Sequence, residues 1–142
     1  MTEYLLVDGY NMLFSQKEFN AEENMEGARE KLINMLCNYK GVNKTQIILV
    51  FDAYRVEGGT ERIEERSGIY IVYTKEAETA DSYIERTTHE LVKNYHVTVA
   101  TSDSVEQVVI MGTGAMRMSS NDLYERLKSG EKEIAEYIRK RR

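Results

Sequence analysis

Five aspartates are the residues in this sequence whose type and placement most clearly suggest chemistry. Asp8 ends the apolar run Leu-Leu-Val, Asp52 ends the longer run QIILVF, and Asp103 closely follows the run VTVAT. Asp81 opens a helical pattern, and Asp122 lies in a polar stretch nearer the C-terminus. Aspartate is a poor helix-interior residue that favours caps and turns, so its positions are informative. Carboxylates held at such points can move protons or bind divalent cations.

Hydrophobic periodicity predicts the elements that must hold these acids. Apolar, β-branched runs predict strands at about residues 3–7, 46–51, 69–73 and 97–101, with a last short strand at 115–118. Apolar residues spaced three and four apart predict helices at about residues 22–40, 80–95 and 104–111, and a further one that begins at Ser119 or Ser120. We expect Gly41 to end the first helix, residues 53–67 to form a mobile loop, and Ser129-Gly130 to precede a basic C-terminal helix at about 131–142.

The order strand, helix, strand, loop, strand, helix, strand, helix is typical of a parallel sheet with helices on both faces. With right-handed crossovers it predicts an α/β fold, a three-layer α/β/α sandwich, in one domain over residues 1–142. Ligands of such sheets bind beyond the carboxyl ends of the strands. Four of the five aspartates should therefore meet at that edge: Asp8, Asp52, Asp81 and Asp103. Asp122 is expected to be a surface acid in the first turn of its helix.

Each of these four acids also has a plainer explanation. Asp81 and Asp103 could each cap a helix, and Asp52 could begin a turn. Asp8 is harder to explain in this way, because Gly-Tyr-Asn after it is not a usual helix start. Four neighbouring carboxylates would repel one another and raise their pKa values unless a cation neutralised them. With no histidine or cysteine beside them, these oxygen ligands favour Mg²⁺ or Mn²⁺, as one or two ions.

Composition excludes several other classes of protein. The chain has 142 residues, of which 42% are hydrophobic and 30% charged, as in soluble globular proteins. No apolar run approaches the roughly 20 residues that span a bilayer, and the N-terminus has no signal-peptide pattern. The single cysteine, Cys37, is expected to be a small core thiol and fits a cytoplasmic location. His89 and His96 are expected to be surface or packing residues, and no P-loop, dinucleotide fingerprint or nucleophile elbow is present.

Five stretches in this order resemble the YacP-like branch of the NYN domain nucleases, within the PIN-like superfamily: LLVDGYNML, VFDAY, YTKEAETADSYIE, VATSDSVEQ and GAMRMS. The resemblance extends over nearly the whole chain, and its most specific parts are Asp-Gly-Tyr-Asn, Glu-Thr-Ala-Asp and Thr-Ser-Asp. It implies a metal-dependent ribonuclease with a PIN-like fold. Because a relative acts on messenger RNA at the ribosome, it also implies RNA and the ribosome as partners, with no membrane and no small-molecule cofactor.

Carried over by position, the resemblance implies a catalytic set of four acids and one amide: Asp8, Asp81, Asp103, Asp52 and Asn11. The four aspartates would bind the metal, and Asn11 would shape the pocket. Glu78 and Ser102 lie beside these motifs and could contact the metal through water, or could equally be a surface acid and a helix-capping hydroxyl. The implied reaction is hydrolysis of RNA phosphodiester bonds by a metal-activated water, which leaves a 5′-phosphate.

The formal net charge of −5 argues against a polyanion binder, but bound metal would neutralise much of the acid at the edge. Positive charge near the edge is expected from Arg55, Lys75 and Arg117, and on the loop from Arg62 and Arg66. The basic end RKRR could bind phosphates or could be a solvated helix end. Tyr10 and Tyr54 could stack on unpaired bases or could pack against the protein.

Two other functions use the same kind of fold. A phosphorylation receiver also gathers aspartates at strand ends, but it needs paired acids at the first strand and a lysine, usually followed by proline. Here Val7 precedes Asp8 and the chain has no proline. A non-catalytic RNA- or ribosome-binding module is the stronger alternative, and retention of all the acids argues against it.

Overall fold

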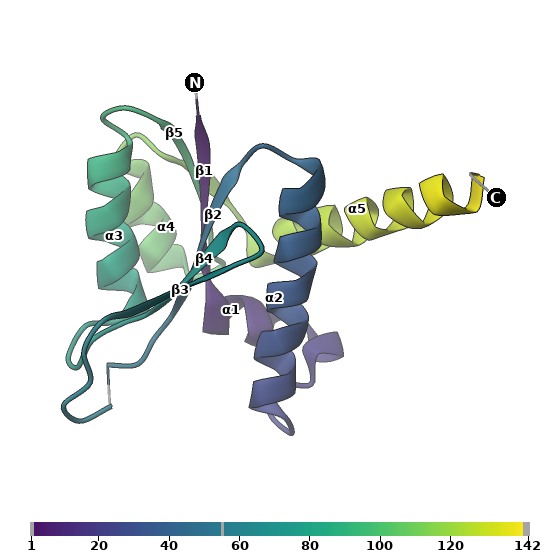
Figure 1. Cartoon of the computed structure of the whole chain (residues 1–142). Coiled ribbons are helices and arrows are strands. Elements are labelled where there is room, and N and C mark those ends of the chain that lie inside the picture. The colour runs from purple at the N-terminus through teal and green to yellow at the C-terminus, as the bar shows by residue number, and fades with distance from the viewer. Residues whose placement is uncertain (1, 55, 141–142) are drawn as a thin grey trace.

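The computed structural model describes residues 2–54 and 56–140 (Figure 1). Within these residues six strands are found: β1 (Glu3–Asp8), β2 (Gln46–Phe51), β3 (Arg62–Arg66), β4 (Ile69–Tyr73), β5 (His96–Ala100) and β6 (Met116–Met118). They form one sheet in the order β3-β4-β2-β1-β5-β6. Neighbouring strands are parallel except for β3 and β4, which pair antiparallel. The prediction of a mainly parallel sheet is confirmed.

Helices cover both faces of this sheet. They are α1 (Gly9–Ser15), a short 3₁₀ turn η1 (Lys17–Phe19), α2 (Met25–Val42), α3 (Ala80–Leu91), α4 (Ser104–Met111) and α5 (Ser120–Lys140). Figure 1 shows α3 and α4 on one side of the sheet and α2 and α5 on the other. The three-layer α/β/α sandwich is therefore confirmed. No helix in the described part of the chain is long and apolar enough to cross a membrane.

The central strands β1 and β2 are apolar over most of their length because each of their faces is covered. In β1, Leu5 and Val7 belong to the core beneath α1, α2 and α5, whereas Leu6 belongs to the core beneath α3 and α4. In β2, Leu49 and Val50 divide between the two cores in the same way. A strand buried on both faces has no solvent side on which polar residues could alternate. These two strands thus form a rigid centre that ends at Asp8 and Asp52.

One expectation about the middle of the chain is corrected by the structure. Residues 53–67 were expected to be a mobile loop, but Arg62–Arg66 forms the edge strand β3. Its side chains are largely exposed, so the charged sequence RIEER carries little hydrophobic pattern. A two-residue turn joins β3 to β4, with Ser67 at φ 50° and Gly68 at φ 87°. Positive φ at both positions is the geometry of a type I′ hairpin turn, which Ser-Gly signals only weakly.

The helix boundaries also differ from those expected. Gly41 lies inside α2, which ends at Val42, and α5 continues through Ser129-Gly130 as one helix. Glycine in an exposed helix costs about 1 kcal/mol relative to alanine, which the long amphipathic α5 tolerates. The basic terminal helix is therefore the end of α5, and Arg141 and Arg142 lie outside the described residues. The short helix α1 was not expected at all.

Candidate active site

Three carboxylates from different elements meet at the carboxyl edge of the sheet. Asp8 ends β1, Asp81 lies in the first turn of α3, and Glu106 lies in the first turn of α4. One oxygen from each lies within 4.8 Å of the others. Asp8 and Glu106 are buried and Asp81 is exposed, so the cluster opens to solvent on one side. The edge predicted from the sequence does gather acids, but one of the three was not predicted.

Glu106 is the residue that sequence reasoning missed. Asp103-Ser104-Val105-Glu106 resembles a capping box, which assigns the glutamate to the surface at a helix start. Asp103 does cap α4, because its Oδ1 accepts hydrogen bonds from the backbone N–H groups of Val105 (2.9 Å) and Glu106 (3.0 Å). The Glu106 side chain instead points inward and is only 4% exposed. The capping-box pattern therefore predicts the Asp103 cap correctly but wrongly predicts that the Glu106 side chain lies at the surface.

The Glu106 carboxyl has one satisfied oxygen and one that lacks a donor. Its Oε2 accepts a hydrogen bond from the Thr101 hydroxyl at 2.9 Å. Its Oε1 is buried and has no hydrogen-bond partner among the described residues. A buried acceptor without a donor is unfavourable by about 1–3 kcal/mol, and more when it is charged. This oxygen therefore favours a proton or a cation beside it.

Burial and mutual repulsion raise the pKa values of all three acids. Burial is the main cause for Glu106, whose pKa is raised to about 9, and the charges of Asp8 and Asp81 add to it. Burial also raises the pKa of Asp8 to about 6, against the opposing hydrogen bonds from the Glu106 carboxyl and from the Asn11 N–H. The pKa of Asp81 is raised chiefly by burial, with a contribution from the charges of Asp103 and Asp52. At neutral pH without a cation, this cluster therefore retains a proton.

The other two predicted acids mainly hold helix starts in place. Asp52 Oδ1 accepts from the Tyr54 N–H at 3.0 Å, and its Oδ2 accepts from the Ala80 N–H at 3.3 Å, at the first residue of α3. Asp103 caps α4 as described. Asp8 also caps a helix, since its Oδ1 accepts from the Asn11 N–H at 3.3 Å at the start of α1. Thus Asp8 combines capping with a place in the cluster, while metal binding by Asp52 and Asp103 stays a prediction.

Asn11 ties together three segments around the cluster. Its Oδ1 accepts from the Ser102 N–H at 2.8 Å and from the Ser120 hydroxyl at 2.7 Å. The Ser102 hydroxyl in turn accepts from the Ser120 N–H at 3.0 Å. These bonds connect α1, the loop after β5 and the start of α5, which are 91 and 109 residues apart from Asn11 in sequence. The amide therefore has a structural role beside the site, and the Ser102 hydroxyl is engaged in the same network.

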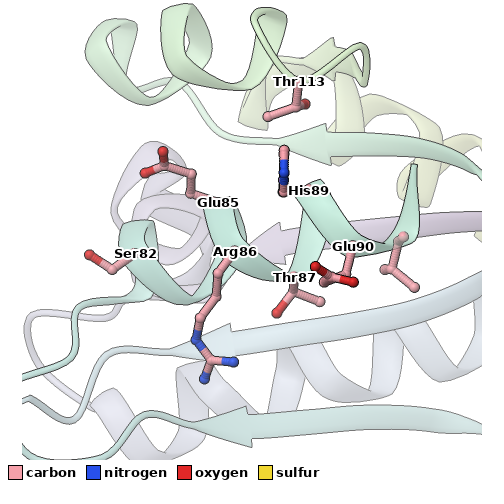
Figure 2. A pocket seen from close by; sticks show the side chains of 8 residues that line it. Ser82, Glu85, Arg86, Thr87, His89, Glu90 and Thr113 are labelled. Atoms are coloured by element: carbon pink, nitrogen blue, oxygen red, sulfur yellow. The ribbon is translucent and has the colours of Figure 1, made fainter. Parts of the chain in front are cut away.

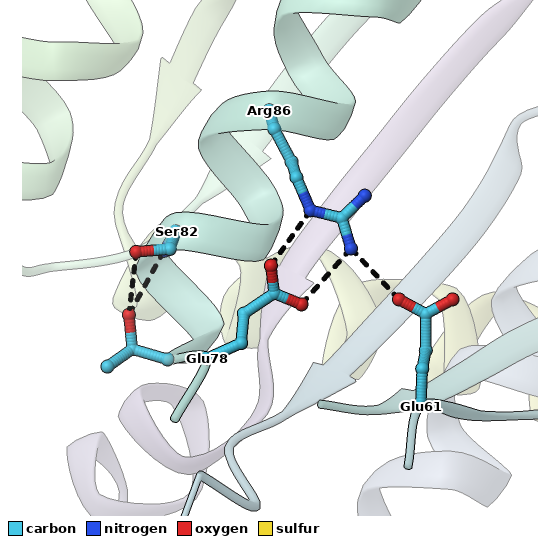
Figure 3. A network of polar contacts seen from close by, with 5 residues as sticks. Glu61, Glu78, Ser82 and Arg86 are labelled. Atoms are coloured by element: carbon cyan, nitrogen blue, oxygen red, sulfur yellow. Dashed lines mark hydrogen bonds and ion pairs between the residues drawn. The ribbon is translucent and has the colours of Figure 1, made fainter. Parts of the chain in front are cut away.

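Glu78 has an ion-pair partner, shown in Figure 3. Its carboxylate pairs with Arg86 Nε at 2.9 Å, and Arg86 Nη2 also reaches Glu61 at 2.9 Å. The Arg86 guanidinium in addition lies 4.6 Å from the centre of the Tyr83 ring. The hydrogen bond from Arg86 lowers the pKa of Glu78. This network fastens the segment before α3 to α3 itself, three residues from Asp81.

A groove of about 510 Å³ runs along the cluster. It is lined by Asp8, Tyr10, Asn11, Phe14, Ser15, Asp52, Ala80, Asp81 and Ser102. Tyr10 packs on Phe51 with ring centres 5.1 Å apart, and its hydroxyl accepts from Arg29 at 3.3 Å, which supports a packing role. A larger hollow of about 730 Å³ lies on the outer side of α3 and reaches Thr113 (Figure 2). It contains none of the predicted site residues, so the groove beside the acids is the better candidate.

None of the predicted RNA-contacting cations among the described residues lines this groove. Lys75 follows the end of β4, and Arg117 lies in β6 opposite Val99; both are exposed. Neither lines the groove. Arg62 lies over the Tyr73 ring at 4.2 Å, and Arg66 pairs with Glu30. Arg55 lies outside the described residues, so its predicted role has no structural counterpart.

The donor set fits a divalent cation. All three ligands are hard carboxylate oxygens, which suit Mg²⁺ or Mn²⁺ better than zinc. The unpartnered Glu106 Oε1 and the closeness of the three oxygens are both explained if a cation lies among them. Burial chiefly raises the pKa values of Asp8 and Glu106, and a cation among the three oxygens would offset that effect by favouring the ionised carboxylates.

Comparisons of the sequence and of the structure with known proteins all point to YacP-like proteins. The family model described as YacP-like NYN domain matches residues 5–142. The protein YacP of Bacillus subtilis (strain 168) is 36% identical over 141 residues, which cover 97% of this chain and 82% of that protein. The crystal structure of Rae1 (YacP) from Bacillus subtilis matches with a TM-score of 0.82 at 34% identity, over 96% of this chain and 80% of that one. A mutant of the same protein matches with a TM-score of 0.85 at 34% identity, over 98% and 83%.

Proposed function

Because the chain belongs to the YacP-like NYN domain family, we propose that it is a metal-dependent endoribonuclease acting on single-stranded RNA. The substrate would be messenger RNA, met in the cytoplasm on the ribosome. The reaction would be hydrolysis of a phosphodiester bond that leaves a 5′-phosphate.

One observation carries the proposal: Asp8, Asp81 and Glu106 each bring a carboxylate oxygen within 4.8 Å of the others, and Glu106 also has a buried oxygen that lacks a donor among the described residues. Such an arrangement lowers stability unless a proton or a cation neutralises part of its charge. A protein whose only task was to bind RNA would gain nothing from burying like charges. The cost is understandable if the same charges are needed to hold a catalytic ion.

In this proposal, Asp8, Asp81 and Glu106 would hold one Mg²⁺ or Mn²⁺ ion. When bound, the ion would supply a water of lowered pKa and offset negative charge on the scissile phosphate. Asp52 and Asp103 fix the starts of α3 and α4, and so fix the directions of Asp81 and Glu106. They are also the candidates for holding a second ion.

The remaining residues would bind and orient the RNA. Asn11 keeps α1 against the loop that carries Ser102, which sets the shape of the groove floor. Lys75 and Arg117 would contact phosphates on either side of the groove. With few cations at hand, intrinsic affinity for RNA would be low, which suits an enzyme that a larger assembly presents with its substrate.

A cleavage assay with matched acid variants tests the proposal. A 5′-labelled single-stranded RNA is incubated with Mn²⁺ and the protein, beside Asp81→Asn and Asp122→Asn. Asp81→Asn should lower the rate by at least about 100-fold, as expected when a metal-ligand set is disrupted. Asp122→Asn should cut like the unchanged protein, because Asp122 lies exposed in α5. Excess EDTA should stop the reaction.

Two results would contradict this scheme. Equal cutting by Asp81→Asn and the unchanged protein would exclude the proposed metal centre. Complete inertness toward RNA alone and RNA on ribosomes, with binding intact, would instead favour a non-catalytic RNA- or ribosome-binding module.

A further inference from the structure

Phe14 is a large apolar side chain left open beside the carboxylates. It is 59% exposed, although Met12 and Leu13 on the same helix are fully buried. It lines the same groove as Asp8 and Asp81. Single exposed apolar side chains are common on protein surfaces, but an aromatic ring inside a groove offers a large flat face that a ligand can cover. Its position in the groove therefore calls for an explanation that simple packing does not give.

The other aromatic ring in the groove already has partners. Tyr10 packs on Phe51 and accepts a hydrogen bond from Arg29. Phe14 belongs to neither hydrophobic core, and no ring pair within the described residues includes it. Phe14 thus offers the available aromatic face in the groove.

The chemistry around Phe14 suits a nucleobase better than a phosphate. The described residues that line the groove include three acids and no lysine or arginine. A phosphate away from a bound ion would be repelled there. By contrast, Asn11 is one helical turn before Phe14, about 5 Å along the axis, and Ser15 follows it. The Asn11 Oδ1 and the Ser15 hydroxyl already make hydrogen bonds within the protein, so what this part of the groove offers is the flat apolar ring, which matches the apolar face of a base.

We propose that Phe14 is a stacking platform for one unpaired base of the RNA beside the bond that is cut. This inference rests on the proposed function and deepens it, because it names the residue that receives one base of the single-stranded RNA. A base must leave its own stack to lie on Phe14, so a paired duplex would be excluded. Since every base has an apolar face, the platform would tolerate different sequences.

RNA binding by Phe14 variants in EDTA tests the inference without any catalysis. The probe is a short single-stranded RNA that contains 2-aminopurine, whose fluorescence is quenched when it stacks. Phe14→Ala should weaken binding about 5- to 150-fold, the range that corresponds to loss of one base–aromatic stack. It should also abolish the change in 2-aminopurine fluorescence, whereas Phe14→Trp should retain both.

Val42→Ala is the matched control. Val42 is also 59% exposed, but it ends α2 just before the start of β2, at the opposite edge of the sheet. It should bind RNA like the unchanged protein, and both alanine variants should keep the melting temperature within a few degrees.

The outcomes separate this inference from the proposed function. Three results would overturn the stacking role. They are unchanged RNA affinity and fluorescence in Phe14→Ala, an equal loss of RNA affinity in Val42→Ala, and no RNA binding by the unchanged protein. Cleavage of RNA by a Phe14→Ala protein with unchanged affinity would leave the nuclease proposal intact. Phe14-dependent binding without any cleavage would support stacking and contradict the nuclease.

Discussion

At the scale of single residues, the Asp8–Glu106 pair makes stability depend on pH in an unusual direction. Folding raises the pKa of Asp8 from 3.8 to about 6 and that of Glu106 from 4.5 to about 9, mainly through burial. At pH values between the ordinary and the raised pKa of each group, the folded chain binds more protons than the unfolded chain. The free energy of unfolding therefore falls as pH rises through this range. Most carboxylates, whose pKa is lowered by folding, contribute in the opposite sense.

We predict that in EDTA the protein is more stable at pH 5 than at pH 8.5. Urea unfolding at both values, followed by circular dichroism, measures the difference directly. Glu106→Gln keeps the shape of the side chain and removes its charge, so it should flatten the dependence and raise stability at pH 8.5 by about 1–3 kcal/mol. Glu85→Gln, an exposed change on α3, is the control and should leave the curve unchanged.

A rise in stability from pH 5 to pH 8.5 in EDTA would contradict the prediction that folding raises the pKa values of Asp8 and Glu106. Saturating Mn²⁺ should stabilise the unchanged protein more at the higher pH, because the ion replaces a proton. Glu106→Gln should lose most of that gain.

Sequence reasoning identified Asp8 and Asp81 because their type and place are unusual. It missed Glu106 because a glutamate three residues after a capping aspartate has an ordinary surface explanation. Whether such a side chain folds back to the cap or turns inward depends on contacts with Asp8 and Thr101. Asp8 ends β1 and Thr101 follows β5, so neither contact can be read from the sequence of α4 itself. The same limit applies to Asp8, whose capping role depended on an unexpected helix.

At the scale of elements, the Arg86 network holds the segment before α3 in place (Figure 3). We predict that Arg86→Ala lowers the melting temperature by about 2–5 °C, which corresponds to about 1 kcal/mol for a half-exposed network with several bonds. The loss should exceed that of an isolated surface pair, because Glu78 is only 11% exposed and would lose its partner.

Lys93→Ala provides the comparison by differential scanning calorimetry. Lys93 pairs with Glu90 just beyond α3, and both side chains are well exposed. This variant should change the melting temperature by less than about 2 °C. Equal effects of the two variants would show that the Arg86 network is no more than a surface ion pair.

The inner strands of the sheet were easier to predict than the edge strand β3. β1, β2, β4 and β5 are recognisable because burial on two faces produces continuous apolar runs. β3 has one exposed edge and charged side chains, so pairing with β4 defines it more than its own sequence does. Similarly, Gly130 is a local break signal that the amphipathic pattern of α5 overrides.

At the scale of the whole molecule, the net charge of −5 and the acidic groove predict weak dependence of RNA binding on salt. Each phosphate contact on a single strand contributes about −0.7 to the slope of log K against log salt concentration. With about two contacts, we expect a slope between about −1 and −2. Lys75→Ala and Arg117→Ala should each make it shallower by about 0.7.

Fluorescence anisotropy at several salt concentrations measures these slopes. Lys44→Ala is the control, because Lys44 is exposed just before the start of β2, at the edge opposite the groove. A slope steeper than about −4 would mean that phosphate contacts, and not base contacts, provide most of the affinity.

The sandwich itself was predictable because strand and helix order restricts the possible folds. The order of strands in the sheet, by contrast, depends on which crossovers form. The sequence does not reveal that β1 lies at the centre between β2 and β5. That central place is what brings Asp8 between α3 and α4.

The length of α5 has a consequence for measurements of size in solution. Its 21 residues form a rod of about 32 Å; Glu133, Ile134 and Tyr137 still line a hollow with the end of α2, and Figure 1 shows the last turns of α5 projecting beyond α2. A compact chain of this length has a radius of gyration near 14–15 Å. The projecting end gives the chain more hydrodynamic drag than a compact chain of the same mass has, so the monomer should sediment slowly and elute early from a sizing column. Elution volume alone would then suggest a dimer, and light scattering is the appropriate measure of its mass.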